Sequence, residues 1–148
     1  MTRKRLIRSL AVLSFGFATF ALAADFGTAA EAKAMLEKAV VALKANQASA
    51  LSMFTKGEGG FKDRDLYPFC GGPDGMFTAH PSLVGKSLKD LKDKSGKALG
   101  EDIYKSAQEG KITEVSYMWP RPGTTDPVQK VSFVTKVGNQ VCAVGYYK

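Results

Sequence analysis

The chain has 148 residues, of which 45% are hydrophobic and 24% are charged. This length predicts about one domain, and the composition excludes a disordered chain, a collagen-like repeat and a polytopic membrane protein. The net charge of +7 gives little support for nucleic-acid binding, because four of the 21 basic residues lie within the first 23 positions, and the remainder has 17 basic against 14 acidic residues.

The first residues have the three parts of a secretory signal peptide. Residues 1–8 are basic, residues 10–22 are mostly apolar, and Ala21-Leu22-Ala23 has the small-x-small pattern of a cleavage site. The apolar run is short for a helix that must cross about 30 Å of hydrocarbon. We therefore expect a signal peptide over residues 1–23 and a mature periplasmic domain over residues 24–148. An uncleaved membrane anchor is the alternative.

A helical region is predicted next. Thr28 and Glu31 have the spacing of a capping box, and the apolar residues that follow recur at helical intervals. The stripe resumes in phase after the polar pair Asn46-Gln47. This pattern predicts either one long helix with a weak point or two helices in line, followed by a linker at residues 57–60. The apolar positions are Ala32, Met35, Leu36, Ala39, Val40, Leu43, Ala50, Leu51 and Phe54.

The remaining chain reads as strands with one helical insert. A type I turn at residues 72–75 separates the first two predicted strands, and residues 82–112 contain a predicted helix near 101–108. The lysines of this insert alternate with Asp90 and Asp93, which we expect to form a solvated surface. The predicted strands cover residues 66–70, 76–80, 115–119, 128–137 and 140–147.

Gly138-Asn139 is a hairpin signal that fixes the pairing of the last two strands. Counting outward from this turn places alternate residues on opposite faces of the sheet. Both faces carry apolar side chains, so we expect a helix to cover one face and a cavity to be possible on the other. The predicted pairs are Val137 with Gln140, Thr135 with Cys142, Phe133 with Val144 and Val131 with Tyr146. Lys130, Ser132, Val134, Ala143, Gly145 and Tyr147 are predicted to share the second face.

Cys70 and Cys142 are the two cysteines, and their spacing excludes a thioredoxin-type site and covalent haem attachment. In an oxidising compartment such a pair tends to close, so we predict a disulfide. The alternatives are two free thiols, or a nucleophilic Cys70 acting with His80.

The order and spacing of several segments in the predicted mature chain resemble the single-Cache family of extracytoplasmic sensor domains. These segments are residues 32–40 (AKAMLEKAV), 61–67 (FKDRDLY), 75–81 (GMFTAHP), 83–88 (LVGKSL), 117–120 (YMWP), 130–134 (KVSFV) and 144–147 (VGYY).

The resemblance implies an α+β fold, with a long N-terminal helix along one face of a five-stranded antiparallel PAS-like sheet. It also places the first and fifth strands side by side, which brings Cys70 near Cys142. Pro68 departs from the family pattern, since proline cannot donate to a ladder, and predicts that the first strand begins late or is partly unpaired.

The family resemblance implies sensing of small ligands, often short carboxylates or amino acids. Family members usually sit between two membrane spans and control a chemoreceptor or a histidine kinase. The chain shows no second span and nothing follows Lys148, so we expect a stand-alone domain that acts through a membrane chemoreceptor or histidine kinase.

Five residues are candidates for a pocket that binds a small anion. Lys130 stands among apolar residues of a strand, where a buried ammonium needs an anionic partner; a strand-end lysine that reaches solvent is the alternative. His80 ends a strand that the resemblance places near the pocket, although it could cap its own turn. Tyr117 and Trp119 share a face as pocket walls or as ordinary core, and Ser132 lies on the face of Lys130. We expect Lys130 to be the main anion contact, and the contribution of His80 to depend on pH near about 6.5.

Enzyme signatures are absent from the sequence, which has no H-E-x-x-H, G-x-S-x-G or Walker loop. One histidine and two cysteines leave little for a metal site. We therefore expect no catalytic activity and no cofactor. Two hypotheses remain. The first is a module that binds a small organic anion or amino acid. The second is a ligand-free protein-interaction module, with a pocket filled by its own side chains, that regulates a membrane receptor or kinase.

Overall fold

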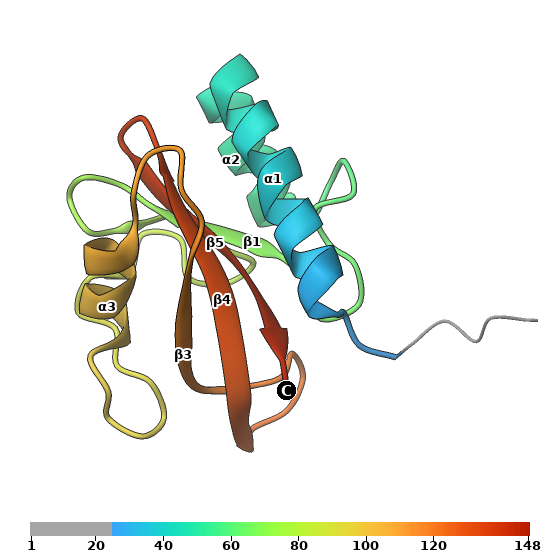
Figure 1. Cartoon of the computed structure of the whole chain (residues 1–148), viewed down its shortest axis with the longest axis vertical. Helices are drawn as coiled ribbons and strands as arrows, with labels where there is room; N and C mark the ends of the chain where they lie inside the picture. The colour runs from blue at the N-terminus through green and yellow to red at the C-terminus, as the bar shows by residue number, and fades with distance from the viewer. Residues whose placement is uncertain (1–24) are drawn as a thin grey trace, which may run out of the picture.

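The computed structural model describes residues 25–148, so the predicted signal peptide lies outside the described residues. Two helices pack on one face of a curved sheet and a shorter helix lies on the other side (Figure 1). The elements are α1 (Ala29–Ala45), α2 (Gln47–Lys56), β1 (Pro68–Gly71), β2 (Phe77–Ala79), α3 (Leu99–Ser106), β3 (Thr113–Pro120), β4 (Pro127–Val137) and β5 (Gln140–Tyr147).

Helix α1 begins at the predicted capping box. The Thr28 backbone N–H donates to Glu31 Oε2 at 2.8 Å, and the Glu31 backbone N–H donates to Thr28 Oγ1 at 3.3 Å. These two bonds satisfy amide groups that a helix start otherwise leaves unpaired. The predicted start of the helical region is confirmed.

The chain reverses at Asn46, which corrects the prediction of one long helix or two helices in line. Asn46 is extended (φ −160°, ψ 100°), and its side chain accepts the N–H of Ser49, so one residue ends α1 and begins α2. Lys38 in the middle of α1 donates to the carbonyl of Gly59, beyond the end of α2, at 2.6 Å. Helix α2 therefore folds back beside α1 (Figure 1).

The sheet has five antiparallel strands in the order β2-β1-β5-β4-β3, which confirms the predicted fold class. The first strand begins at Pro68, two residues later than the hydrophobic pattern predicts, and Pro68 lies opposite Val144 of β5. Leu66 belongs instead to a turn in which it exchanges backbone hydrogen bonds with Asp63 at 2.8 Å and 3.1 Å. The late start follows from the missing N–H of Pro68.

The register of β4 and β5 is the predicted one, with all four expected pairs present. Phe133 and Val144 lie on the face that packs against α1 and α2. Val134 and Ala143 lie on the opposite face, where they pack with buried side chains of β3 and α3. Each face of the sheet therefore carries its own apolar core, as the two-sided pattern of the strands indicates.

The predicted disulfide between Cys70 and Cys142 is confirmed. The two residues are register partners on β1 and β5, their Cα atoms are 4.1 Å apart, and 72 positions separate them in sequence. Both side chains are fully buried. This pairing leaves no free cysteine in the described chain and rules out a nucleophilic Cys70 in this state.

Asp93 corrects the prediction of a solvated surface in the lysine-rich insert. Its side chain is buried and accepts backbone N–H groups from Ser95, Lys97 and Met118 at 2.8–2.9 Å. Burial alone would raise the pKa of Asp93, but these hydrogen bonds outweigh it and lower the pKa to about 2. Asp93 thus fastens the insert to β3.

Helix α3 begins two residues earlier than predicted, at Leu99, and packs directly on residues 88–91, an earlier part of the same insert. A side chain at Gly100 would collide with the backbone carbonyl of Leu88, and the Gly100 N–H donates to the carbonyl of Leu91 at 2.9 Å. This close approach holds residues 88–91 against α3 on the second face of the sheet.

Candidate ligand-binding site

A small cavity lies on the second face of the sheet, between the strands, α3 and the insert. Its volume is about 20 Å³, which is room for about one water molecule. Two of its lining side chains, Lys130 and His80, can carry a positive charge. The other lining residues are aromatic or aliphatic and include Tyr67, Phe69, Phe77, Ile103, Tyr117 and Trp119.

Lys130 reaches this cavity from the middle of β4 and is 2% exposed. Its Nζ donates to Tyr67 Oη at 3.1 Å and lies 4.5 Å and 4.7 Å from the ring centroids of Tyr67 and Tyr147. Within residues 25–148, no carboxylate lies within ion-pair distance of this ammonium. Burial lowers the pKa of Lys130 to about 7, and the negative charge of Asp65 opposes that shift.

Gly145 makes the position of Lys130 possible. A Cβ atom at Gly145 would stand 2.5 Å from Lys130 Cε and 2.5 Å from Ser132 Oγ. The absence of a side chain at Gly145 therefore leaves room for the Lys130 side chain to run across β5 toward Tyr67.

His80 lies next to Lys130 and is held in place by its own turn. Its Nδ1 accepts the N–H of Ser82 at 3.0 Å, and its ring packs edge-on against Tyr67 and Phe77. Burial, helped by the charge of Lys130, lowers the pKa of His80 to about 4. The imidazole is therefore neutral near pH 6.5, so the pH response expected there does not come from His80.

Tyr117, Trp119 and Ser132 lie together on the same side of the sheet. Tyr117 is the register partner of Lys130, and its hydroxyl shares a 2.8 Å hydrogen bond with Ser132 Oγ. The Trp119 ring stands edge-on to Tyr117, with centroids 6.3 Å apart. The structure thus brings four of the five sequence-predicted residues to one cavity. The fifth, Ser132, does not line the cavity and contacts it through its hydrogen bond to Tyr117.

Sequence reasoning missed two charged residues behind this cavity. The buried carboxylate of Asp65 accepts the N–H of Gly27 at 2.7 Å and pairs with Arg121 Nη1 at 3.0 Å. The Arg121 guanidinium stacks between the rings of Phe26 and Tyr147, 4.0 Å and 4.8 Å from their centroids. Asp65 stands in the FKDRDLY segment, which was the only signal pointing to it.

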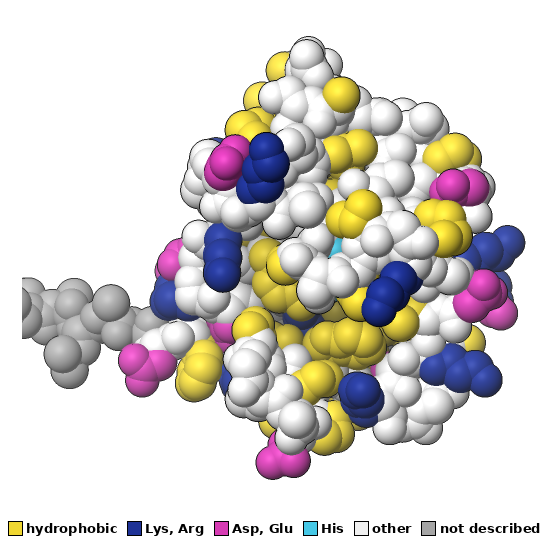
Figure 2. All heavy atoms as spheres, turned by 180° about the vertical axis from the view of Figure 1, so that it is seen from behind, with side chains coloured by type: hydrophobic (Ala, Val, Ile, Leu, Met, Phe, Trp, Pro, Cys, Tyr) yellow, Lys and Arg dark blue, Asp and Glu magenta, His cyan; other side chains and the backbone are white. Residues whose placement is uncertain are grey.

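A wider cleft of about 270 Å³ opens beside the cavity, and Trp119 is one of the residues that line it. Tyr67, His80, Leu83 and Trp119 line both spaces and therefore form the partition between them. Figure 2 shows hydrophobic side chains gathered on this side of the molecule, with a small area of the histidine visible between them. A small molecule could approach Lys130 from this cleft if the partition opened.

Residues 25–148 contain no group of three histidine, cysteine or acidic side chains placed to hold a metal ion. They also contain no helix with the length and hydrophobicity needed to cross a bilayer.

Comparison with known proteins agrees with this architecture. The chain matches the protein family described as Cache domain (dCache_2) over residues 32–146. It is similar to a solved structure described as the periplasmic sensor domain of a chemotaxis protein, with a TM-score of 0.60 and 24% identity over 78% of this chain and 86% of that one. A second solved structure, described as showing carboxylic acid recognition by a Cache chemosensory domain, gives a TM-score of 0.56 and 23% identity over 78% and 84% of the two chains.

A curated relative, methyl-accepting chemotaxis protein McpP of Pseudomonas putida, is 32% identical over 59 residues. That segment is 40% of this chain and 11% of the relative, so the similarity covers a small part of the longer protein. The two structural matches support the fold, and the family match extends over most of the described residues. The chain therefore belongs to the Cache domain family.

Proposed function

We propose that this Cache domain is a periplasmic sensor module that binds a small monocarboxylate at Lys130 and signals through a membrane chemoreceptor or histidine kinase. The observation that carries the proposal is the buried Lys130 ammonium, which has a hydroxyl and two aromatic rings as neighbours but no carboxylate from the described residues within ion-pair distance. A buried charge is stable when an opposite charge pairs with it. A ligand carboxylate would supply that charge.

The charges around the cavity favour one negative charge on the ligand. With Lys130 protonated, the buried Lys130 and Asp65 and the partly exposed Arg121 together carry two positive charges and one negative charge. One carboxylate would balance this net charge. An amino acid would also bring an ammonium group, and the nearby Asp65 already accepts from Gly27 and Arg121. We therefore favour a monocarboxylate with a short apolar tail over an amino acid.

The remaining predicted residues have supporting roles in this proposal. Tyr117 and Trp119 form walls against which the tail packs. Neutral His80 accepts at Nδ1 and so carries its proton on Nε2, which leaves one donor for a ligand oxygen. Ser132 positions the Tyr117 hydroxyl.

Binding requires the cavity to enlarge, because about 20 Å³ is too little for a carboxylate and its tail. We propose that the partition of Tyr67, His80, Leu83 and Trp119 moves and joins the cavity to the outer cleft. A ligand that binds only the open conformation would shift the equilibrium between the closed and the open conformation toward the open one.

The comparisons support the class of ligand and the cellular role. One structural neighbour is described as recognising a carboxylic acid, and the curated relative is a chemotaxis receptor. We propose that residues 1–23 are a signal peptide and residues 24–148 the mature domain.

A thermal-shift screen tests this function. Purified mature protein is mixed with acetate, propionate and lactate, and with glycine, alanine and succinate for comparison. The monocarboxylates should raise the melting temperature, because a ligand at a hundred times its Kd stabilises the folded state by about 2.7 kcal/mol. Lys130→Met should weaken binding at least about tenfold, or about 1.4 kcal/mol.

The matched control is Lys97→Met, because Lys97 lies outside the cavity, where it bonds to Ser116 and pairs with Asp102. This variant should bind as the wild type does. If Lys130→Met binds a monocarboxylate with wild-type affinity, the assignment of the site is wrong.

The small volume and apolar lining of the cavity favour a second candidate, a protein-interaction module whose pocket stays filled. In that case none of the six compounds changes the melting temperature. The screen therefore separates the two candidates.

A further inference from the structure

A strained turn stands between the cavity and the start of the domain. Asp63, Arg64, Asp65 and Leu66 form this turn, which we call the clamp turn, and its ends exchange two backbone hydrogen bonds. Arg64 has φ of 56° and is the single non-glycine residue with a positive φ among the described residues. Such a conformation persists only where surrounding contacts hold it.

The clamp turn holds the leading segment, residues 26–28, which runs into α1. Asp65 accepts the Gly27 N–H at 2.7 Å, and Arg64 Nη1 donates to the Phe26 carbonyl at 3.0 Å. Gly27 also lies so close to the Leu66 side chain that a Cβ atom there would overlap it. A third polar contact, from Arg64 Nη2 to Glu31 at 2.7 Å, reaches the first turn of α1.

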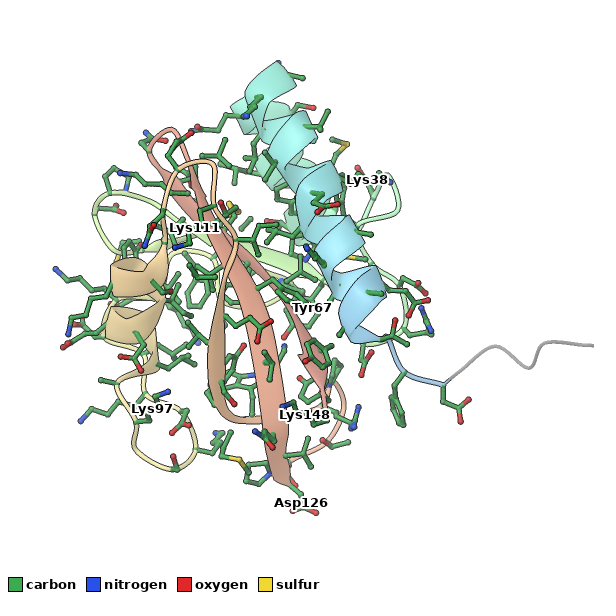
Figure 3. The ribbon with its side chains drawn as sticks, viewed as in Figure 1. Lys38, Tyr67, Lys97, Lys111, Asp126 and Lys148 are labelled. Carbon is green, nitrogen blue, oxygen red and sulfur yellow. A yellow bond between two sulfur atoms is a disulfide. The ribbon has the colours of Figure 1, made fainter. Side chains whose placement is uncertain are left out.

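The same turn contacts the cavity by two routes. Tyr67, labelled in Figure 3, directly follows the turn, and its hydroxyl accepts from Lys130. Asp65 pairs with Arg121, whose guanidinium stacks on Tyr147, and Tyr147 in turn faces the Lys130 ammonium. A change at Lys130 therefore reaches the leading segment through neighbouring side chains.

We propose that occupation of the cavity is coupled to the anchoring of residues 26–28 through the clamp turn, so that filling the site releases the leading segment. The inference rests on the proposed function for its ligand. Tyr67 must move when the partition opens, since it borders both spaces. That movement pulls on Leu66 and Asp65, and the turn loses the contacts that hold Arg64 in its strained conformation. By linkage, loosening the turn must also favour occupation.

Amide hydrogen exchange tests the coupling without any ligand. Lys130→Met removes the Nζ contact to Tyr67, so the Gly27 N–H should exchange faster by about fivefold or more, the lower range of measured couplings. The exchange rate of the Ala143 amide, in the middle of the sheet, reports any general loss of stability and should not increase. Lys97→Met, at the lysine labelled in Figure 3, is the matched control and should leave Gly27 unchanged. Unchanged exchange at Gly27 in Lys130→Met would overturn the coupling.

A titration with sodium propionate separates this inference from the proposed function. In wild-type protein, bound propionate should accelerate exchange at Gly27, and Arg64→Gln should bind propionate more tightly than wild type because its turn is already loosened. Lys105→Gln breaks an exposed ion pair on α3 and should bind as wild type does. Propionate that binds without changing exchange at Gly27 overturns the coupling and leaves the proposed function standing. Altered exchange in Lys130→Met with no propionate binding supports the coupling and rejects the proposed ligand.

Discussion

Lys130 is the buried cation of the candidate site. Burial removes water from its ammonium, and a tyrosine hydroxyl with two aromatic faces replaces that water only in part. The result is a pKa lowered to about 7. Near neutral pH the side chain therefore stands between its charged and neutral forms, and a bound anion would favour the charged form.

Anion binding should weaken as the pH rises above 7. Only protonated Lys130 attracts a carboxylate, so above its pKa of about 7 each binding event takes up a proton. The Kd for propionate should then increase by up to about tenfold per pH unit. Calorimetry in buffers of different ionisation enthalpy measures the protons taken up. A Kd that stays constant across this range would contradict the prediction.

The variant His80→Gln is the control for this pH profile. The pKa of His80 is about 4, so its imidazole stays neutral throughout the range. The variant should keep the wild-type slope of Kd against pH, whatever its absolute affinity. A slope that disappears in His80→Gln would assign the titration to the histidine.

Lys130→Met should stabilise the unliganded protein at and below pH 7. The folded pKa is about 7, below the ordinary lysine pKa of 10.5, so the unfolded chain binds more protons and wild-type stability rises with pH between these values. Methionine removes the buried charge at similar volume, which we expect to add about 1–3 kcal/mol to the free energy of unfolding. Urea titrations compare the two proteins near neutral pH and at pH about 9, where the gain should shrink. A gain that is independent of pH would show that the charge of Lys130 is not its cause.

At the scale of elements, the strands were predicted better than the helices. The Gly138-Asn139 turn fixes the register of β4 and β5, because a two-residue loop allows one pairing and side chains alternate along each strand. The reversal at Asn46 could not be predicted in this way. The apolar residues on both sides of Asn46 recur at the same helical intervals whether the chain continues straight or folds back. The hydrogen bond that distinguishes the two arrangements, from Lys38 to Gly59, is a tertiary contact that the sequence pattern does not contain.

The disulfide joins β1 and β5, which are the first and last strands in chain order and are neighbours in the sheet. Its removal should destabilise the fold. It closes a loop of 72 residues, for which loop entropy predicts a loss of about 4 kcal/mol in the free energy of unfolding. We expect the double variant Cys70→Ala, Cys142→Ala to show this loss in urea denaturation.

Thiol titration of the unfolded, unreduced wild type provides the control for that comparison. It should find no free thiol, because both cysteines are paired in the structure. Two reactive thiols, or a double variant as stable as the wild type, would contradict the structural role of this bond.

The candidate site could be predicted only in part, and the reason is physical. A lysine between apolar strand residues signals a buried charge, and strand alternation places Tyr117 and Ser132 on its face. Tyr67, Asp65 and Arg121 join them only through tertiary packing, from segments that carry no periodic pattern. Asp93 was misjudged for a similar reason, because its partners are backbone N–H groups that the sequence does not display. The volume of the cavity depends on how all these side chains pack together.

At the scale of the whole molecule, the protein recovered from the periplasm should begin at Ala24. Asp25 and Phe26 are exposed, whereas Gly27 is buried and bonded to Asp65. The folded domain thus leaves accessible residues directly after the predicted cleavage site at Ala21-Leu22-Ala23. Intact mass spectrometry of the periplasmic fraction measures the N-terminus. Ala23→Arg, which breaks the small-x-small pattern, should leave the full-length chain in the membrane fraction. Wild-type protein found at full length in that fraction would show instead that residues 1–23 are kept as an anchor.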